Sequence, residues 1–258
     1  MVLSRAASGA AALVTVRATS SRLPGKCLLP ITADLTALQI VLRRAALTGV
    51  PVVVATSDDP SDDPVAALAG REGAAVFRGA RLNKLRRWRD CAESLGLDRV
   101  LMVDGDDLAF DYAIGRRVLA AMATSDADAW RAPDDIVCGL FTAAYTRDAL
   151  DRLAALAPDP AQDTDVIDVF IARAGLRLAY PELHEHERAA TVRLTLDYAE
   201  DADFFRAMYA ELPVDAPGPT IVRTALARGW WRINWGRQQD YLDNQAAFNR
   251  KVDTHADH

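Results

Sequence analysis

The first half of the chain alternates short apolar runs with longer segments in which apolar residues recur at helical spacing. The short runs show no regular polar alternation, which is typical of strands buried on both faces of a mostly parallel sheet. Strands are therefore predicted at 11–16, 50–56, 74–77 and 99–103, with helices at 34–48, 63–72, 83–95 and 111–124. This order predicts an α/β fold in which helices flank a mostly parallel sheet.

The second half has a less regular pattern. We expect further strands at 127–132, 136–145 and 191–196, and helices at 146–157, 164–174, 200–212 and in two pieces within 219–251. No internal repeat, low-complexity segment or interdomain linker interrupts the chain, so a single domain is predicted over 1–258.

Composition narrows the classes of partner. The formal net charge of −6 does not favour nonspecific binding to nucleic acid or to membranes. No apolar run approaches the ~20 residues of a transmembrane helix. Cys27, Cys91 and Cys138 are far apart and fit neither a zinc spacing nor a disulfide framework. Reduced thiols in a cytoplasmic protein are the expected state.

The loop after the first predicted strand, "RATSSRLPGK" (17–26), runs against the negative net charge. It combines small residues with three cations, Arg17, Arg22 and Lys26. Main-chain N–H groups of such a loop can form an anion-binding nest, to which the cations add fixed charge. The loop lacks the glycine patterns of a Walker loop and of a dinucleotide fingerprint. Phosphate binding is one interpretation, and a basic surface loop is the other.

Carboxylates follow another buried strand in "DGDD" (104–107) and a later one in "LTLDYAED", which contains Asp197. One or two carboxylates beside a phosphate-binding loop suit Mg²⁺, which also takes waters and phosphate oxygens. The alternatives are an ordinary turn at 104–107 and a helix start after Asp197, where Glu200 and Asp201 would cap the helix. We assign capping to those two and keep Asp197 for the metal. The polar segments at 17–26, 56–63 and 104–107 all follow strands, so they should converge on one cleft.

The motifs "RATSSRLPGKCLLPI", "VVVATSDDPSDDPVAALAGREGAAVFRG", "VDGDD" and "RLTLDYAEDADFF" occur in this order along the chain. In this respect the chain resembles the cytidylyltransferase family, which makes CMP-activated acidic sugars and includes the CMP-KDO and CMP-sialate synthetases. It is most similar to the SpsF-like branch of spore coat polysaccharide biosynthesis. The resemblance implies a nucleotidyltransferase fold of the GT-A-like, Rossmann-like type.

The resemblance also implies CTP and Mg²⁺ as ligands, an acidic small-molecule acceptor and a homodimer. Residues of the first loop would contact the CTP phosphates: Arg17, Ser20, Ser21, Arg22 and Lys26, of which Arg17, Arg22 and Lys26 would be catalytic. Residues near the nucleotide and the rim of the cleft would be Thr56, Ser57, Asp58, Arg78 and Gly79. Asp106 and Asp197 would hold the metal.

The resemblance places the core of the domain at about 11–125 and 190–212. It leaves about 126–190 for acceptor binding or dimerisation, and a helical tail at 213–258. Two segments depart from the branch: "RLNKLRR" (81–87) is basic where acids are usual, and 102–109 lacks the usual residues around "GD". The first departure would suit an anionic acceptor such as a carboxylate or a phosphonate. A glycosyltransferase that uses a preformed nucleotide sugar and a noncatalytic nucleotide-binding relative are the alternatives.

Overall fold

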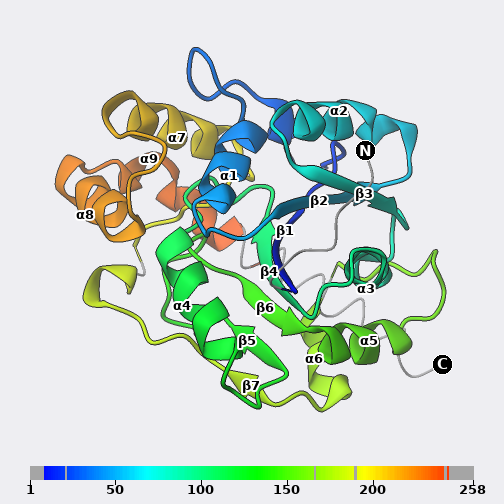
Figure 1. Ribbon diagram of the computed structural model, residues 1–258. Helices are drawn as coiled ribbons and strands as arrows, with labels where there is room; N and C mark the ends of the chain where they lie inside the picture. Colours follow the sequence, from blue (N-terminus) through cyan, green and yellow to red (C-terminus); the bar gives the residue numbers. More distant parts are fainter. Residues whose placement is uncertain (1–8, 21, 166, 189–190, 241–242, 244–258) are drawn as a thin grey trace.

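The computed structural model describes residues 9–20, 22–165, 167–188, 191–240 and 243. These residues form a seven-stranded sheet with helices on both faces (Figure 1). Its strands, in the spatial order β3-β2-β1-β4-β6-β5-β7, are β1 (Ala10–Thr15), β2 (Val52–Ser57), β3 (Ala75–Gly79), β4 (Arg99–Asp104), β5 (Ala129–Arg131), β6 (Ala143–Thr146) and β7 (Leu178–Ala179).

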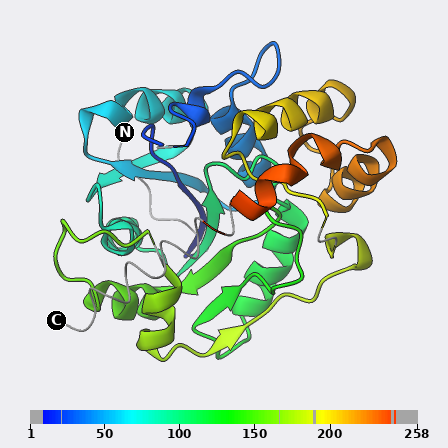
Figure 2. The ribbon, with the colours of Figure 1, turned by 180° about the vertical axis from the view of Figure 1, so that it is seen from behind.

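The helices that cover the sheet are α1 (Ala37–Ala46), α2 (Asp63–Arg71), α3 (Lys84–Ser94), α4 (Tyr112–Met122), α5 (Arg147–Ala155), α6 (Ile167–Ala174), α7 (Ala199–Glu211), α8 (Gly218–Arg228) and α9 (Trp231–Asn234). The last three lie together beside α1, as the opposite views in Figures 1 and 2 both show. Among the helices of the described residues, none combines the length and apolar character that crossing a membrane requires.

The four strands of the first half are parallel, as predicted, and β6 alone runs antiparallel to its neighbours β4 and β5. Successive residues of β1 face opposite sides of the sheet. Ala12 and Val14 belong to an apolar cluster with α1, α2 and α4, whereas Ala11 and Leu13 belong to one with α3 and α5. Both faces of β1 are buried, which explains why its sequence is a continuous apolar run.

Two predicted strands differ from the structure. The segment 191–196 is extended but forms only one bridge, between Arg193 and Cys138. Its amides at Leu194 and Leu196 donate to the carbonyls of Cys138 and Asp106, so the segment closes over the end of the sheet. Of the predicted strand at 136–145, residues 143–145 belong to a strand of the sheet, β6. Part of the predicted helical tail, at 241–242 and 244–251, lies outside the described residues.

Gly139 allows the segment before Asp197 to approach. It has a φ of 92°, and a Cβ placed there would lie 2.0 Å from the carbonyl oxygen of Leu194. A side chain would therefore meet both backbone strain and a main-chain clash.

We expect Gly139→Ala to lower the free energy of unfolding by more than about 2 kcal/mol, because strain and overpacking add. Urea denaturation measures this. Gly70→Ala is the control, since Gly70 lies in α2 with open space around it; it should be neutral or stabilise by up to about 1 kcal/mol. Equal stability of the two variants would contradict the close approach at Gly139.

Candidate active site

The loop that follows β1 turns back on itself and brings Lys26 to the carboxyl end of the strand. Gly25 has a φ of 69°, in the left-handed region that favours glycine. Its amide donates to the carbonyl of Ala18 at 3.3 Å. A short 3₁₀ helix starts at Lys26 and buries Cys27 beneath the loop. The Pro-Gly pair of the sequence thus makes the turn that directs Lys26 inward.

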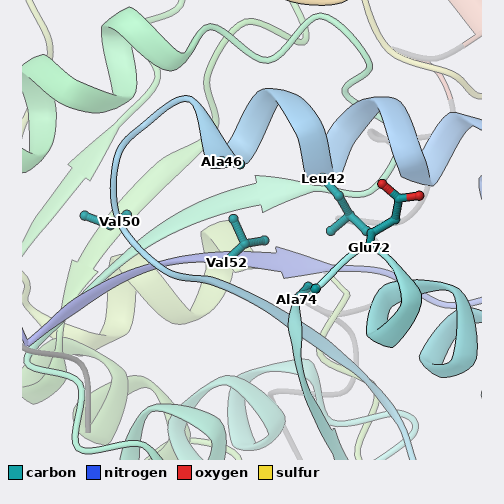
Figure 3. Close-up of a pocket in the computed structure, with 7 residues that line it drawn as sticks. Leu42, Ala46, Val50, Val52, Glu72 and Ala74 are labelled. Carbon is teal, nitrogen blue, oxygen red and sulfur yellow. The ribbon is translucent and has the colours of Figure 1, made fainter. Parts of the chain in front are cut away.

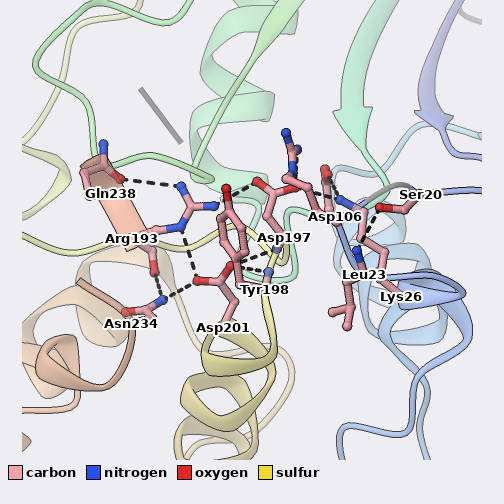
Figure 4. Close-up of polar contacts among 11 residues, drawn as sticks. Ser20, Leu23, Lys26, Asp106, Arg193, Asp197, Tyr198, Asp201, Asn234 and Gln238 are labelled. Carbon is pink, nitrogen blue, oxygen red and sulfur yellow. Dashed lines mark hydrogen bonds and ion pairs between the residues drawn. The ribbon is translucent and has the colours of Figure 1, made fainter. Parts of the chain in front are cut away.

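The Lys26 ammonium joins two carboxylates from distant parts of the chain (Figure 4). Its Nζ lies 2.6 Å from Asp106 Oδ2 and 2.9 Å from Asp197 Oδ1. Arg22 Nη2 lies 2.5 Å from the same Asp197 oxygen. The fold therefore brings together four residues that the sequence singled out.

Asp106 is placed by the glycine before it. The Gly105 amide donates to the Thr15 carbonyl at 3.0 Å, and a Cβ on Gly105 would lie 2.6 Å from Val16 Cβ. Only glycine fits this contact between the end of β4 and the start of the first loop. From the other side, the Leu196 amide donates to the Asp106 carbonyl at 2.8 Å. Asp106 is thus held between the first loop and the segment that leads to Asp197.

The charged groups of this cluster stabilise one another in their ionised forms. Burial alone would raise the pKa of Asp197, but the charges of Lys26 and Arg22 outweigh burial and hold it at about 2. Burial would lower the pKa of Lys26, yet the charges of Asp106 and Asp197 raise it above its ordinary value. Lys26 and Asp197 are therefore both ionised at neutral pH, and their pairing offsets the cost of burying each charge.

The other carboxyls of "DGDD" have a different environment. Asp104 and Asp107 both lie within hydrogen-bond distance of the Thr142 hydroxyl, at 3.0 and 3.2 Å. Burial raises the pKa of both, and the nearby Asp106 charge raises each further. Of the three, Asp106 is the one that forms an ion pair with Lys26.

A buried network fixes the orientation of Asp197 (Figure 4). Arg193 Nη2 lies 2.8 Å from Asp197 Oδ2, and its Nε lies 3.2 Å from Asp201 Oδ1. Asn234 of α9 donates to the same Asp201 oxygen at 2.9 Å. Asp201 Oδ2 accepts from the amides of Asp197 and Tyr198, which confirms its capping role. One Asp197 oxygen is thus taken by Arg193, which leaves the other for Lys26 and Arg22.

Sequence reasoning missed Arg193 and Asn234. The signal for Arg193 was its place four residues before Asp197, within a segment that was interpreted only as a strand. Asn234 carried no local signal, because its partners come from a distant part of the chain. Glu200, which was also assigned to capping, pairs with Arg237 at 2.7 Å.

Asp62, also missed, ties the first loop to the end of β2. One oxygen accepts from the Ala18 amide at 2.6 Å, and the other accepts from the Ser57 amide at 3.1 Å and from the Ser57 hydroxyl. The carboxylate is almost completely buried. Ser57 therefore donates its hydroxyl proton within the protein, and the start of the loop is fixed to the neighbouring strand.

The remaining rim residues lie at the carboxyl ends of β2 and β3, without contacts to Lys26. Thr56 is buried, and its hydroxyl has no partner within the described part of the chain. Asp58 is exposed, with its amide bonded to the Gly79 carbonyl at 2.9 Å. Arg78 forms an ion pair with Asp63 at 2.6 Å.

The residues of the first loop that were predicted to contact phosphate do not all lie together. Ser20 Oγ accepts from the Leu23 amide at 3.4 Å. Ser21 lies outside the described residues. Arg17 pairs with Asp165 at 3.0 Å and donates to the Arg81 carbonyl, whereas Lys26 and Arg22 pair with Asp197. The structure thus separates Arg17 from Arg22 and Lys26, with which it was grouped.

Asp106 and Asp197 fit a hard divalent cation. Their oxygens contact one common Nζ, so the two carboxylates lie close together and would be the residues that hold such an ion. Among the described residues, no group of three or more His, Cys, Asp or Glu side chains is arranged to hold a metal. A magnesium ion here would take its other ligands from water and substrate, as Mg²⁺ commonly does.

A separate pocket of about 210 Å³ lies at the opposite, amino ends of β2 and β3 (Figure 3). It is lined by Leu42, Ala46, Val50, Val52, Glu72, Gly73 and Ala74. Its Glu72 carboxylate is already bonded to Gln39 and Arg43. The pocket is therefore no part of the Lys26 cluster.

Residues 11–154 match the sequence profile of the family described as "Cytidylyltransferase". The chain belongs to the cytidylyltransferase family. This confirms the resemblance inferred from the motifs and makes the protein a nucleotidyltransferase. The matched region contains the first loop and Asp106, whereas Asp197 lies beyond it.

Individual relatives agree with the family. The chain is 28% identical over 206 residues to the spore coat polysaccharide biosynthesis protein SpsF of Bacillus subtilis, covering 76% of this chain and 85% of that protein. A Leptospira borgpetersenii cytidylyltransferase structure superposes with a TM-score of 0.76 at 21% identity, covering 86% of this chain and 96% of that one.

A structure of CMP:2-keto-3-deoxy-manno-octonic acid synthetase complexed with CTP gives a TM-score of 0.60 at 20% identity, with 78% and 98% coverage. These two structures confirm the nucleotidyltransferase fold.

The buried network predicts a stability difference between two arginines. Arg193→Met leaves Asp197 and Asp201 partly unpaired in the interior, so it should lower the free energy of unfolding by about 3–5 kcal/mol. Arg206→Met removes an exposed pair with Asp203 and should cost no more than about 1 kcal/mol. Urea denaturation of both variants provides the comparison. A small loss for Arg193→Met would contradict the role given to this network.

Proposed function

We propose that this cytidylyltransferase uses CTP and Mg²⁺ to make a CMP-activated acidic sugar, of the nonulosonate or KDO type, with release of pyrophosphate. The observation that carries the proposal is the Lys26 ammonium between Asp106 and Asp197, with Arg22 on the same Asp197 oxygen. Cations and carboxylates meet here at the ligand-binding edge of the sheet. The SpsF relative, named for polysaccharide biosynthesis, and the CTP complex of the CMP-KDO synthetase support the substrate class.

In the proposed reaction, a hydroxyl oxygen of the acceptor attacks the α-phosphorus of CTP. The new O–P bond forms as the bond to the pyrophosphate oxygen breaks, pyrophosphate leaves with the electron pair, and the hydroxyl proton is released. Asp106 and Asp197 would hold Mg²⁺, which when bound neutralises negative charge on the phosphate oxygens. The chain's own residues act by positioning and by fixed charge, without a covalent enzyme intermediate.

Lys26 and Arg22 would stabilise the departing pyrophosphate. Lys26 stays protonated because its carboxylate neighbours raise its pKa, so a full positive charge is available to phosphate oxygens. On binding of the substrates, Lys26 would exchange a carboxylate partner for phosphate. Arg193 keeps Asp197 oriented during this exchange, since it contacts the other carboxylate oxygen. Arg17 would contact a more distant substrate group.

The second candidate is cytidylyl transfer to another anionic acceptor, such as a phosphonate. It is favoured by the basic segment 81–87, in which Arg81, Lys84, Arg86 and Arg87 stand close in sequence. The roles of Ser20, Thr56, Ser57, Asp58, Arg78 and Gly79 beside the nucleotide belong to the same proposal. The homodimer and the cytoplasmic location stay predictions of the sequence.

The function is tested with a nucleotide panel and pyrophosphate detection. We expect calorimetry in the presence of Mg²⁺ to show tighter binding of CTP than of ATP or GTP, and pyrophosphate release only when CTP meets an acceptor. The acceptor panel contains KDO, a nonulosonate and a phosphonate. Transfer from a preformed nucleotide sugar without pyrophosphate would instead support a glycosyltransferase. Binding of CTP without turnover of any acceptor would support a noncatalytic relative.

Substitutions of Lys26 and of Asp106 should lower the activity in different ways. Lys26→Ala should reduce kcat by ~10²-fold or more, since it removes a preorganised charge that the leaving pyrophosphate needs. Asp106→Asn keeps the shape but removes a charge that binds the metal, so excess Mg²⁺ should partly restore its activity. Steady-state kinetics across a magnesium titration separate the two.

Arg43→Ala, at an exposed cation of α1, is the control and should keep wild-type kinetics. Wild-type turnover in Lys26→Ala or in Asp106→Asn would end the assignment of that residue.

A further inference from the structure

Among the described residues three arginines are almost fully buried, and Arg87 of α3 has the fewest hydrogen-bond and ion-pair partners of the three. Arg44 donates to four main-chain carbonyl oxygens, and Arg193 pairs with two buried carboxylates. Arg87 donates only through Nη1, to the carbonyls of Ala80 at 2.6 Å and Arg81 at 3.2 Å. Its Nε is buried without a partner in the described structure.

The Arg87 guanidinium has no carboxylate in direct contact within the described residues, although Asp165, Asp62 and Asp58 are near enough for their charges to act on it. Buried charges, by contrast, are normally paired. Burial and the nearby charge of Arg17 lower the pKa of Arg87 to about 10 and outweigh the opposing charges of the carboxylates, so the guanidinium remains a cation at neutral pH. A nearby anion would compensate this charge.

Arg17 reaches the same place from the first loop. Its Nη1 donates to the Arg81 carbonyl at 3.1 Å, so two guanidinium groups share one acceptor oxygen. Arg17 closely follows β1, and Arg81 closely follows β3, so the pair lies at the carboxyl ends of parallel strands. This is the edge at which such sheets bind ligands.

One carboxylate, that of Asp165, already contacts Arg17. Asp165 Oδ2 lies 3.0 Å from Arg17 Nη2, and its side chain is 37% exposed. An ion pair this accessible to water contributes little, so a ligand can replace it. The position of the Asp165 carboxylate shows where an oxyanion can receive a hydrogen bond from Arg17.

We propose that Arg17 and Arg87 form an oxyanion subsite, separate from the Lys26 cluster, that takes a phosphate or carboxylate group of a substrate in place of Asp165. This proposal rests on the proposed function, because that function supplies the oxyanion. The oxyanion is either a phosphate of CTP or the acidic group of the acceptor. Two guanidinium groups offer charge-assisted hydrogen bonds that suit either group.

The decisive variant is Asp165→Asn, because the proposed subsite predicts that this variant binds the oxyanion more tightly than the wild type. Without the competing carboxylate, the oxyanion should bind about two- to fivefold more tightly, the amount that an exposed ion pair is worth. Arg87→Met should weaken the same ligand by about tenfold or more, since hydrogen bonds to a charged group are lost. Calorimetry at constant ionic strength with CTP, pyrophosphate and KDO as separate probes measures both without turnover.

Two controls separate the subsite from general charge effects. Asp168→Asn removes an equally negative, exposed group that pairs with Arg131, and it should not tighten binding. Arg89→Met changes an arginine of α3 that lies outside the segment 81–87 and is more exposed than Arg87, and it should leave affinity unchanged. If the variants change the affinity for CTP and pyrophosphate, the subsite binds phosphate. If they change the affinity for KDO alone, the subsite binds the acidic group of the acceptor.

Unchanged or weaker binding in Asp165→Asn overturns the subsite, and so does equal tightening in Asp168→Asn or equal loss in Arg89→Met. If Arg87→Met fails to fold, Asp165→Asn decides alone, because its exposed side chain is dispensable for packing. A wild-type protein that binds these anions but releases no pyrophosphate with any acceptor contradicts the proposed function and leaves the subsite standing.

Discussion

The active-site edge of this protein depends on one ammonium group that two carboxylates share. Lys26, Asp106 and Asp197 come from three distant parts of the chain, and each is largely removed from water. Like charges from Asp106 and Asp197 could not stay so close without a cation between them. The first loop, the end of β4 and the segment before α7 therefore have to meet at a single point, which fixes their relative positions.

Much of this arrangement follows from sequence. β1 to β4 were predictable because both faces of these strands are buried, which leaves apolar runs without alternation. The meeting of Lys26 with Asp106 followed from a rule of topology, since β1 and β4 are parallel neighbours whose carboxyl ends coincide. The motif order then identified the family. The local sequence pattern was sufficient to predict the secondary structure wherever strands and helices alternate regularly.

Other parts could not be predicted, for physical reasons. The segment 191–196 has the composition of a strand, but it lies across the sheet's end and bonds to Cys138 and Asp106 rather than to a full neighbouring strand. Asn234 acts through partners about forty residues earlier in the chain, so no local signal marks it. The direction of the Arg17 side chain depends on Asp165, which only the folded chain brings near.

The two hydrogen-bonding oxygens of Asp62 have a consequence for the kinetics of substrate capture. Both are engaged by the first loop and the end of β2, so the start of the loop is fixed before any ligand arrives. Under the proposed function, a triphosphate that reaches the loop would meet a preformed start of the loop and would spend little conformational entropy on ordering that part. Ordering of this part of the loop would then not slow association, which would be set by diffusion and charge attraction. Release would be limited by the breaking of contacts rather than by the opening of a lid at this position.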